Sequence, residues 1–430
     1  MSPQPVSPRR PGQPPASERS ASAGSAAEPS APAGSAPAGS APEGRSAEGT
    51  AAAPPRYRAR LALLTLGGFV CILAGGVETT ALPLFVTRQA HGSTLDVGIV
   101  VGTLTFSSML ARPLVAQVTR RAGVPVTLLA TSFLTAAVLA AYPWVHSVPV
   151  LAALRAAEGI GDAGFLVAGI TAACAIAPAG REGAATSFFT SVNSLSLVGG
   201  SLIAGWLLTL GGYRATWLAA AGLAVAGGSA AAAAGRGGRP AAVTPRARLR
   251  LLHPAAVRPG ATLALGVLPV GGFFALAPLY AGRAGLSPAA VMALFGGVIF
   301  AARTIGAGAA DRLGGRRGTI LSFASIAAGA AIIGSAPPPA GLLAGTVVFA
   351  AGLALCMPAS LKLVLAATVP AERADVIGTM TACYAAAQTA GAPLLGLVAG
   401  AGGFRLAFAA GAAAPAAALL LQARRERPAP

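Results

Sequence analysis

The chain has 430 residues, of which 54% are hydrophobic and only 10% are charged. A water-soluble globule of this length needs more polar residues than this to cover its surface. The composition therefore indicates a polytopic membrane protein. The formal net charge of +18 would suit a nucleic-acid-binding protein. The basic residues, however, lie between apolar runs without any motif for base recognition, so no nucleic-acid partner is expected.

The first segment, residues 1–60, is dominated by Ala, Pro, Ser and Gly and contains no apolar run. This composition predicts a disordered tail. A signal peptide needs an apolar core of about 7 to 15 residues near its start, which this segment lacks. We therefore expect the tail to stay in the cytoplasm.

The remainder predicts an all-α membrane protein with twelve transmembrane helices, since twelve apolar segments can each cross about 30 Å of hydrocarbon. Residues 61–234 form a first six-helix bundle and residues 260–422 a second. Residues 235–259 form a basic cytoplasmic linker, and residues 423–430 a cytoplasmic tail. The predicted spans are 61–86, 95–117, 125–142, 149–177, 186–210, 214–234, 260–282, 288–310, 318–336, 340–368, 374–400 and 404–422.

Arginine counts predict the orientation of these spans. The loops on one side carry sixteen arginines, with the long N-terminal tail left out, and the loops on the other side carry four. Basic loops remain in the cytoplasm, so both termini and the linker are predicted to be cytoplasmic. With Lys362 as the only lysine, the composition is typical of GC-rich coding, and we expect the plasma membrane of a bacterium.

The two halves of the chain repeat each other at a fixed offset. Arg112 and Arg303 both end a span before a basic loop, and 303 − 112 = 191. The same offset relates Gly200 to Gly391, Gly205 to Gly396, and the run Gly-Gly-Tyr-Arg at 211–214 to Gly-Gly-Phe-Arg at 402–405. This recurrence predicts two pseudo-symmetric bundles of related structure.

Six plus six spans with a basic central linker resemble the major facilitator superfamily over residues 61–422. The loop after the eighth span is similar to the family's D-R-x-G-R-R signature, with Gly315 as an extra residue. The resemblance implies a gating loop at the cytoplasmic face, in which glycine permits the tight turn. The residues expected in this loop signature and its gate are Arg112, Arg303, Asp311, Arg312, Gly314, Arg316 and Arg317.

Three charges in the fourth span need an explanation. Glu158 and Asp162 lie about 60° and 20° around a helix from Arg155, so all three share one face. Charges within a bilayer cost at least about 2.5 kcal/mol each, so they face a partner or a wet cavity. A self-neutralising structural pair of Arg155 and Glu158 remains open. The run from 155 to 161 is similar to the family's RxxQGxG pattern, with Glu158 replacing Gln, which implies that Arg155 handles protons or substrate.

Glu78 lies in the first span with no lysine or arginine within a turn. Its counter-charge must come from another helix, and a buried carboxyl group can then gain and lose a proton. The resemblance implies that the first and fourth helices line a central cavity, in which Glu78 faces Arg155 and Asp162. Polar residues in the fifth and eleventh spans either contact substrate or hold helices together: Asn193, Tyr384 and Gln388.

Glycines of the fifth span, Gly199, Gly200 and Gly205, partly resemble the glycine-proline pattern of proton-linked exporters. Close helix packing, which small residues permit in lipid, is the simpler interpretation and the one we favour.

The sequence contains no catalytic constellation, nucleotide-binding loop, metal site or cofactor motif, and an enzyme is not expected. We predict a monomeric secondary transporter whose partners are a small-molecule substrate, protons and the lipid bilayer. Proton-coupled efflux of a small organic or drug-like solute is the first hypothesis. Proton-coupled uptake of a small nutrient is the second. A membrane receptor or assembly factor that keeps the fold without transporting is the third.

Overall fold

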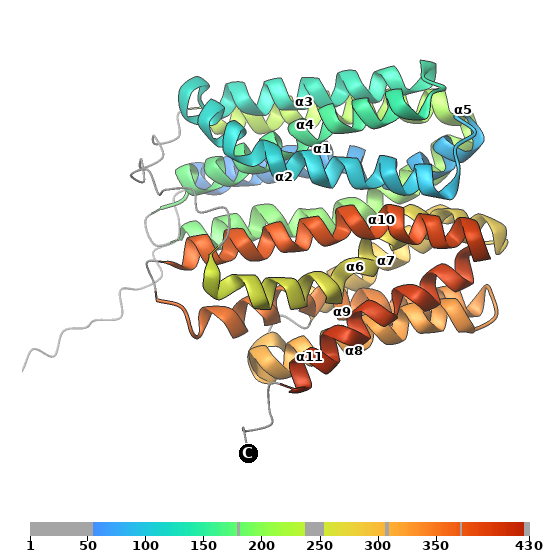
Figure 1. Cartoon of the computed structure of the whole chain (residues 1–430). Helices are drawn as coiled ribbons and strands as arrows, with labels where there is room; N and C mark the ends of the chain where they lie inside the picture. The colour runs from blue at the N-terminus through green and yellow to red at the C-terminus, as the bar shows by residue number, and fades with distance from the viewer. Residues whose placement is uncertain (1–54, 179–180, 237–252, 306–308, 370–371, 425–430) are drawn as a thin grey trace, which may run out of the picture. The chain divides into compact units, whose positions relative to one another are not determined.

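The computed structural model describes residues 55–178, 181–236, 253–305, 309–369 and 372–424. The predicted tail up to residue 54 and most of the predicted linker, residues 237–252, lie outside this part of the chain. Throughout the described ranges the regular structure is helical, as the composition predicts (Figure 1).

Within the residues that the structure describes, the first half contains five α-helices and one 3₁₀ turn, and the second half contains six α-helices. In chain order, the first half comprises α1 (Pro55–Arg88), α2 (Thr94–Ala122), α3 (Val124–Ala141), η1 (Tyr142–Trp144), α4 (Val148–Ile176) and α5 (Glu182–Gly235). The second half comprises α6 (Pro254–Arg283), α7 (Pro288–Thr304), α8 (Ala309–Ser335), α9 (Ala340–Leu365), α10 (Arg373–Gly411) and α11 (Ala413–Arg424).

Ten helical segments of the described chain are long and apolar enough to cross a membrane. Two of them, 52 and 48 residues long, exceed what one crossing needs, because about 20 residues span the hydrocarbon. Each contains a break in helical geometry, at Gly212 in α5 and at Gly402 and Gly403 in α10. Divided at these glycines, the ten segments account for the twelve predicted spans.

Two helices begin earlier than the sequence predicts. α1 starts at Pro55 and α6 at Pro254, so residues 55–60 and 254–259 are helical although we expected them in the tail and the linker. Helical turns can extend past the apolar segment, and proline at the first helical position favours a helix start because no hydrogen bond from its nitrogen is required there.

Backbone geometry confirms the internal repeat. Four glycines have left-handed φ angles at matching positions: Gly123 at 86° and Gly314 at 72°, then Gly212 at 63° and Gly403 at 80°. Both pairs are separated by 191 residues, since 314 − 123 = 191 and 403 − 212 = 191. Only glycine adopts such angles without steric cost, so each half uses glycine at the same two turns.

Aromatic packing repeats in the same way. Phe85 at the end of the first span lies 5.2 Å, between ring centroids, from Tyr213. Tyr280, at the corresponding place in the second half, lies 5.4 Å from Phe404. The offsets are 280 − 85 = 195 and 404 − 213 = 191. The offset at the first span is four residues larger than the later offset, since 195 − 191 = 4. A small insertion after the first span of one half accounts for this difference.

Glycines bring helix backbones together within each half. A β-carbon on Gly200 of α5 would collide with the backbone of α1 at Gly76 and at the Leu73 carbonyl group. A β-carbon on Gly391 of α10 would collide with the Leu268 carbonyl group of α6. These contacts support the packing interpretation of the glycines, because close backbone approach stabilises helix pairs in lipid.

The two halves contact each other through a second symmetric set of small residues. Thr94 Oγ1, at the first turn of α2, donates a hydrogen bond of 2.7 Å to the Gly396 carbonyl oxygen of α10. At the equivalent place, Gly205 of α5 packs against Ala289, in the first turn of α7. Gly98 further along α2 also has no room for a side chain, because Ala392 of α10 lies against it. We call these contacts the inter-half seam.

Candidate functional site

A buried ion pair joins the first and fourth spans. Arg155 Nη1 on α4 donates to Glu78 Oε1 on α1, and it also donates to Glu158 Oε2 at 2.9 Å. The exposed fractions of the three side chains are 7%, 4% and 5%. The counter-charge that the sequence placed on another helix is therefore Arg155, which is shared between two carboxylates.

Tyr142 completes this cluster. Its hydroxyl group lies 2.8 Å from Glu158 Oε2 and 3.3 Å from Glu78 Oε1, and it can donate to either carboxylate. The ring is fully buried and packs edge-on against Trp217 of α5, with 4.9 Å between centroids. We call Glu78, Tyr142, Arg155 and Glu158 the charged cluster. Sequence analysis missed Tyr142, because it lies at the end of the third span and nothing local marks it as polar and buried.

Asp162 has a different partner from the one its helical position suggests. Although it shares a face of α4 with Arg155, its Oδ2 accepts a hydrogen bond of 2.9 Å from Ser108 Oγ of α2. Arg112 lies one turn beyond Ser108 on the same helix, and its charge attracts the Asp162 carboxylate. Asp162 therefore interacts mainly with α2, whereas the charged cluster joins α1, η1 and α4.

Two cavities meet at the charged cluster. The larger, of about 260 Å³, is lined by both Glu158 and Asp162. The smaller, of about 170 Å³, extends toward Gln388 of α10. Both are lined by Glu78, Thr79, Leu104, Arg155 and Phe274. The Glu78 and Arg155 side chains thus lie where the two cavities adjoin.

The cavity walls come from both halves of the chain. Phe274 of α6 lines both cavities, and Gln388 lines the smaller one, opposite residues of α1 and α2. Tyr384 lies one turn before Gln388 on α10, and the described lining of neither cavity includes it. The side chain of Asn193 lies outside the described part of the structure.

Hydroxyl groups add polar character that the sequence did not predict. Thr79 lines both cavities, Thr105 lines the smaller and Thr135 the larger. Apart from the ionisable side chains and Gln388, the remaining lining residues are leucine, phenylalanine, glycine, isoleucine, valine, proline and cysteine. The cavities therefore combine charged, hydroxyl and apolar surfaces.

The residues predicted for the cytoplasmic loop signature do not line the two cavities at the charged cluster. Gly314 makes the turn with φ of 72°, and Arg312, Arg316 and Arg317 are exposed around it. The side chain of Asp311 lies outside the described part of the structure. Arg303 of α7 donates a hydrogen bond of 3.4 Å from Nη1 to Ser194 Oγ of α5, so it links the two halves.

Comparison with known proteins agrees with this architecture. The sequence model of the Major Facilitator Superfamily matches residues 64–338 and 290–430. A chloramphenicol resistance protein of Streptomyces lividans is 33% identical over 284 residues, which are 60% of this chain and 67% of that protein.

Solved transporter structures share the fold. One is a bacterial homologue of the human lysosomal transporter Spinster in an inward-facing and occupied conformation, with a TM-score of 0.72 at 15% identity, covering 88% of this chain and 100% of that one. The nucleoside transporter NupG gives a TM-score of 0.69 at 14% identity, covering 86% and 100%.

Proposed function

This chain belongs to the Major Facilitator Superfamily, and from that premise we propose that it is a proton-coupled exporter of a small organic solute in the cytoplasmic membrane of a bacterium. It works by alternating access, in which two halves rock around a central site and expose it to each side of the membrane in turn. The observation that carries this proposal is the charged cluster at the junction of the two cavities.

The cluster can accept a proton for a simple reason of charge balance. It contains one guanidinium group and two carboxylates, so with both acids ionised one negative charge is left unneutralised. Charges away from water are costly, and adding one proton makes the group neutral as a whole. Glu78 is the acid on which we place this proton, because its side chain lines both cavities.

Protonation then changes the balance between conformations. With Glu78 ionised, Arg155 links α1 to α4; with Glu78 neutral, that link weakens and Arg155 can turn toward Glu158 or the solute. A proton shifts the conformational equilibrium only by the difference in its interaction energy between the two states. The pairing of Glu78 with Arg155 supplies such a difference. Asp162, held by Ser108 at the wall of the larger cavity, is the second acid in the proton pathway.

We assign the inter-half seam the role of the outer gate. In the orientation predicted from arginine counts, Thr94, Gly205, Ala289 and Gly396 lie toward the outer face. Their close contacts would then close the central site to the outside in this conformation. Breaking the seam on that side, while the opposite ends approach each other, would expose the cavities outward.

The walls of the smaller cavity support a solute class. Thr79, Thr105 and Gln388 offer hydrogen bonds beside five apolar residues, and Glu78 and Arg155 already pair with each other, so we infer an uncharged amphipathic molecule with hydroxyl or amide groups. The resistance function in the name of the Streptomyces lividans relative supports export over uptake. Chloramphenicol is accordingly the first solute to test.

Transport by inverted membrane vesicles tests the proposal. Acidifying the lumen should drive labelled chloramphenicol, or another amphipathic amide, into the lumen, and a protonophore should abolish the accumulation. An exporter that exchanges solute for protons predicts this direction. Accumulation driven by an alkaline lumen would instead indicate that solute and protons move in the same direction, as in uptake. If vesicles with and without the protein accumulated the same amount of labelled solute, transport of the tested solutes would be contradicted.

A further inference from the structure

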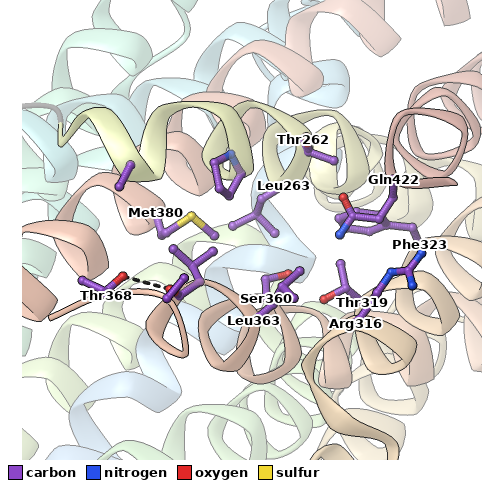
Figure 2. A pocket seen from close by; sticks show the side chains of 14 residues that line it. Thr262, Leu263, Arg316, Thr319, Phe323, Ser360, Leu363, Thr368, Met380 and Gln422 are labelled. Atoms are coloured by element: carbon purple, nitrogen blue, oxygen red, sulfur yellow. Dashed lines mark hydrogen bonds between the residues drawn. The ribbon is translucent and has the colours of Figure 1, made fainter. Parts of the chain in front are cut away.

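A third cavity, of about 290 Å³, lies within the second half, apart from the charged cluster (Figure 2). Its described lining comes from α6, α8, α9, α10, α11 and the residues just after α9. All these segments contribute the ends that lie near the basic loop around Gly314. The cavity therefore belongs to one bundle alone, unlike the solute cavities between the halves.

The one charged side chain of the described lining and two of its polar side chains lie at one end of this cavity, whereas Ser360 lies near the middle and Thr368 at the other end (Figure 2). Figure 2 shows Arg316, Thr319 and Gln422 close together, with Leu263 in the middle and Met380 toward the other end. Arg316 is the only charged residue in the described lining. The arrangement is that of a cationic, hydrogen-bonding head site that continues into a mainly apolar channel, in which Ser360 and Thr368 are polar exceptions.

An unpartnered buried group points to a ligand. The Gln422 side chain is 6% exposed, and its Oε1 atom has no hydrogen-bond partner in the described structure. A buried carbonyl oxygen without a partner destabilises a protein, so native structures usually satisfy such groups by protein, water or ligand. A ligand with a hydroxyl or amide N–H group at this end of the cavity would supply the missing donor.

The head site is built on a close helix contact. A β-carbon on Gly315, directly before Arg316, would lie 2.6 Å from the backbone nitrogen of Leu363. The start of α8 is thus packed against the end of α9, and Leu363 itself lines the cavity. This contact holds the backbone of Arg316 at the mouth of the cavity, as a preformed binding site requires.

We propose that this cavity binds an amphipathic anion whose negative group faces Arg316, whose hydroxyl or amide group donates to Gln422 and whose apolar body lies along Leu263 and Met380. At about 30 Å³ for each water-sized group, the volume holds about ten non-hydrogen atoms. A short acyl carboxylate has this size and chemistry. An anionic phospholipid could present the same chemistry from the membrane.

Calorimetric titration of the purified full-length chain with 3-hydroxyoctanoate, octanoate and 1-octanol tests the site. We expect saturable binding of both anions, with 3-hydroxyoctanoate the tighter. Arg316→Gln should weaken binding of both anions about fivefold, the upper end for an exposed charge pair, and leave 1-octanol unaffected. Arg317→Gln is the matched control, since Arg317 is the next arginine but is not in the described lining, and it should bind like wild type.

Two further variants keep the test decisive if Arg316→Gln folds poorly. Gln422→Leu should remove the advantage of 3-hydroxyoctanoate over octanoate, because it removes the acceptor. Ala367→Trp, at an exposed position of the lining, should block all three probes by filling part of the cavity. Absence of binding to wild type, or equal binding by wild type and Ala367→Trp, would overturn the proposal.

The two sources of the anion are distinguished in lipid nanodiscs. If phospholipid occupies the site, phosphatidylglycerol should suppress 3-hydroxyoctanoate binding relative to phosphatidylcholine. If the ligand is a free anion, both lipids should give the same affinity.

Discussion

Glu78 of α1 and Arg155 of α4, 77 residues apart in sequence, form an ion pair in which the exposed fractions of the two side chains are 4% and 7%. The same Arg155 nitrogen also serves Glu158, at 2.9 Å. Two acids therefore share one cation at the place where the two central cavities adjoin. The consequences of this arrangement for stability and for transport can be measured separately.

Removing the cation should destabilise the protein strongly. Arg155→Gln leaves Glu78 and Glu158 buried without a positive partner, and breaking such a pair costs about 3 to 5 kcal/mol. Unfolding by a denaturing detergent should show this loss. The double variant with Glu78→Gln should recover part of it, because one of the two stranded charges is gone. Strictly additive losses would contradict a direct interaction between these two residues.

The Tyr142 hydroxyl group should contribute to stability and to coupling. Tyr142→Phe keeps the packing on Trp217 but removes a donor to Glu158 and Glu78, which should cost about 1 to 3 kcal/mol. The pH profile of transport should also move, since the carboxylates lose a hydrogen bond. Tyr57→Phe, in a partly buried residue at the start of α1, is the control. If Tyr142→Phe matched wild type in both stability and the pH profile of transport, the Tyr142 hydroxyl group would contribute to neither.

Substitution of Asp162 should change the coupling of transport to protons without disturbing the ion pair of Glu78 and Arg155. Asp162→Asn keeps an oxygen that can accept from Ser108 but removes the charge, so the pH dependence of transport should change while the unfolding transition stays near that of wild type. Ser108→Ala is the complementary variant, because it removes the hydrogen bond and retains the charge. Transport by Asp162→Asn with an unchanged pH profile would remove this residue from the proton pathway.

A side chain at the inter-half seam should shift the conformational equilibrium. A β-carbon on Gly396 would collide with the Thr94 backbone, so Gly396→Val should separate α10 from α2 at that end. A reporter cysteine at Thr105, in a variant without the four native cysteines, should then react faster with an impermeant maleimide added outside. Gly297→Val is the control, since nothing lies within 4 Å of a β-carbon at Gly297. Equal rates for both variants would mean that the seam is not an outer gate.

The fold could be predicted largely from the sequence because membrane constraints are strong and local. Apolar runs fix the spans, and the offset of 191 residues identifies the repeat that Gly212 and Gly403 later display in their φ angles. Helix ends were less predictable: α6 extends to Pro254, since a helix can continue beyond the hydrocarbon without leaving a signal in hydropathy.

The site could be predicted only in part. Its charges stand out because an ionisable residue within an apolar run is expensive, which identified Glu78 and Arg155 as residues in need of partners. The choice of partners depends on how helices are arranged in space. Helical periodicity places Asp162 on the same face as Arg155, yet Ser108 of α2 takes its hydrogen bond. Tyr142 joins the cluster through tertiary packing, which no local sequence pattern predicts.

Solute-driven proton movement in proteoliposomes tests the central claim most directly. An outward chloramphenicol gradient, applied without a pH gradient, should drive protons inward through the wild-type protein, as reported by a pH-sensitive dye in the lumen. Glu78→Gln should abolish this proton flux while solute exchange between the two sides continues. The exposed variant Glu182→Gln should behave like wild type. Proton flux through Glu78→Gln equal to that of wild type would contradict the account.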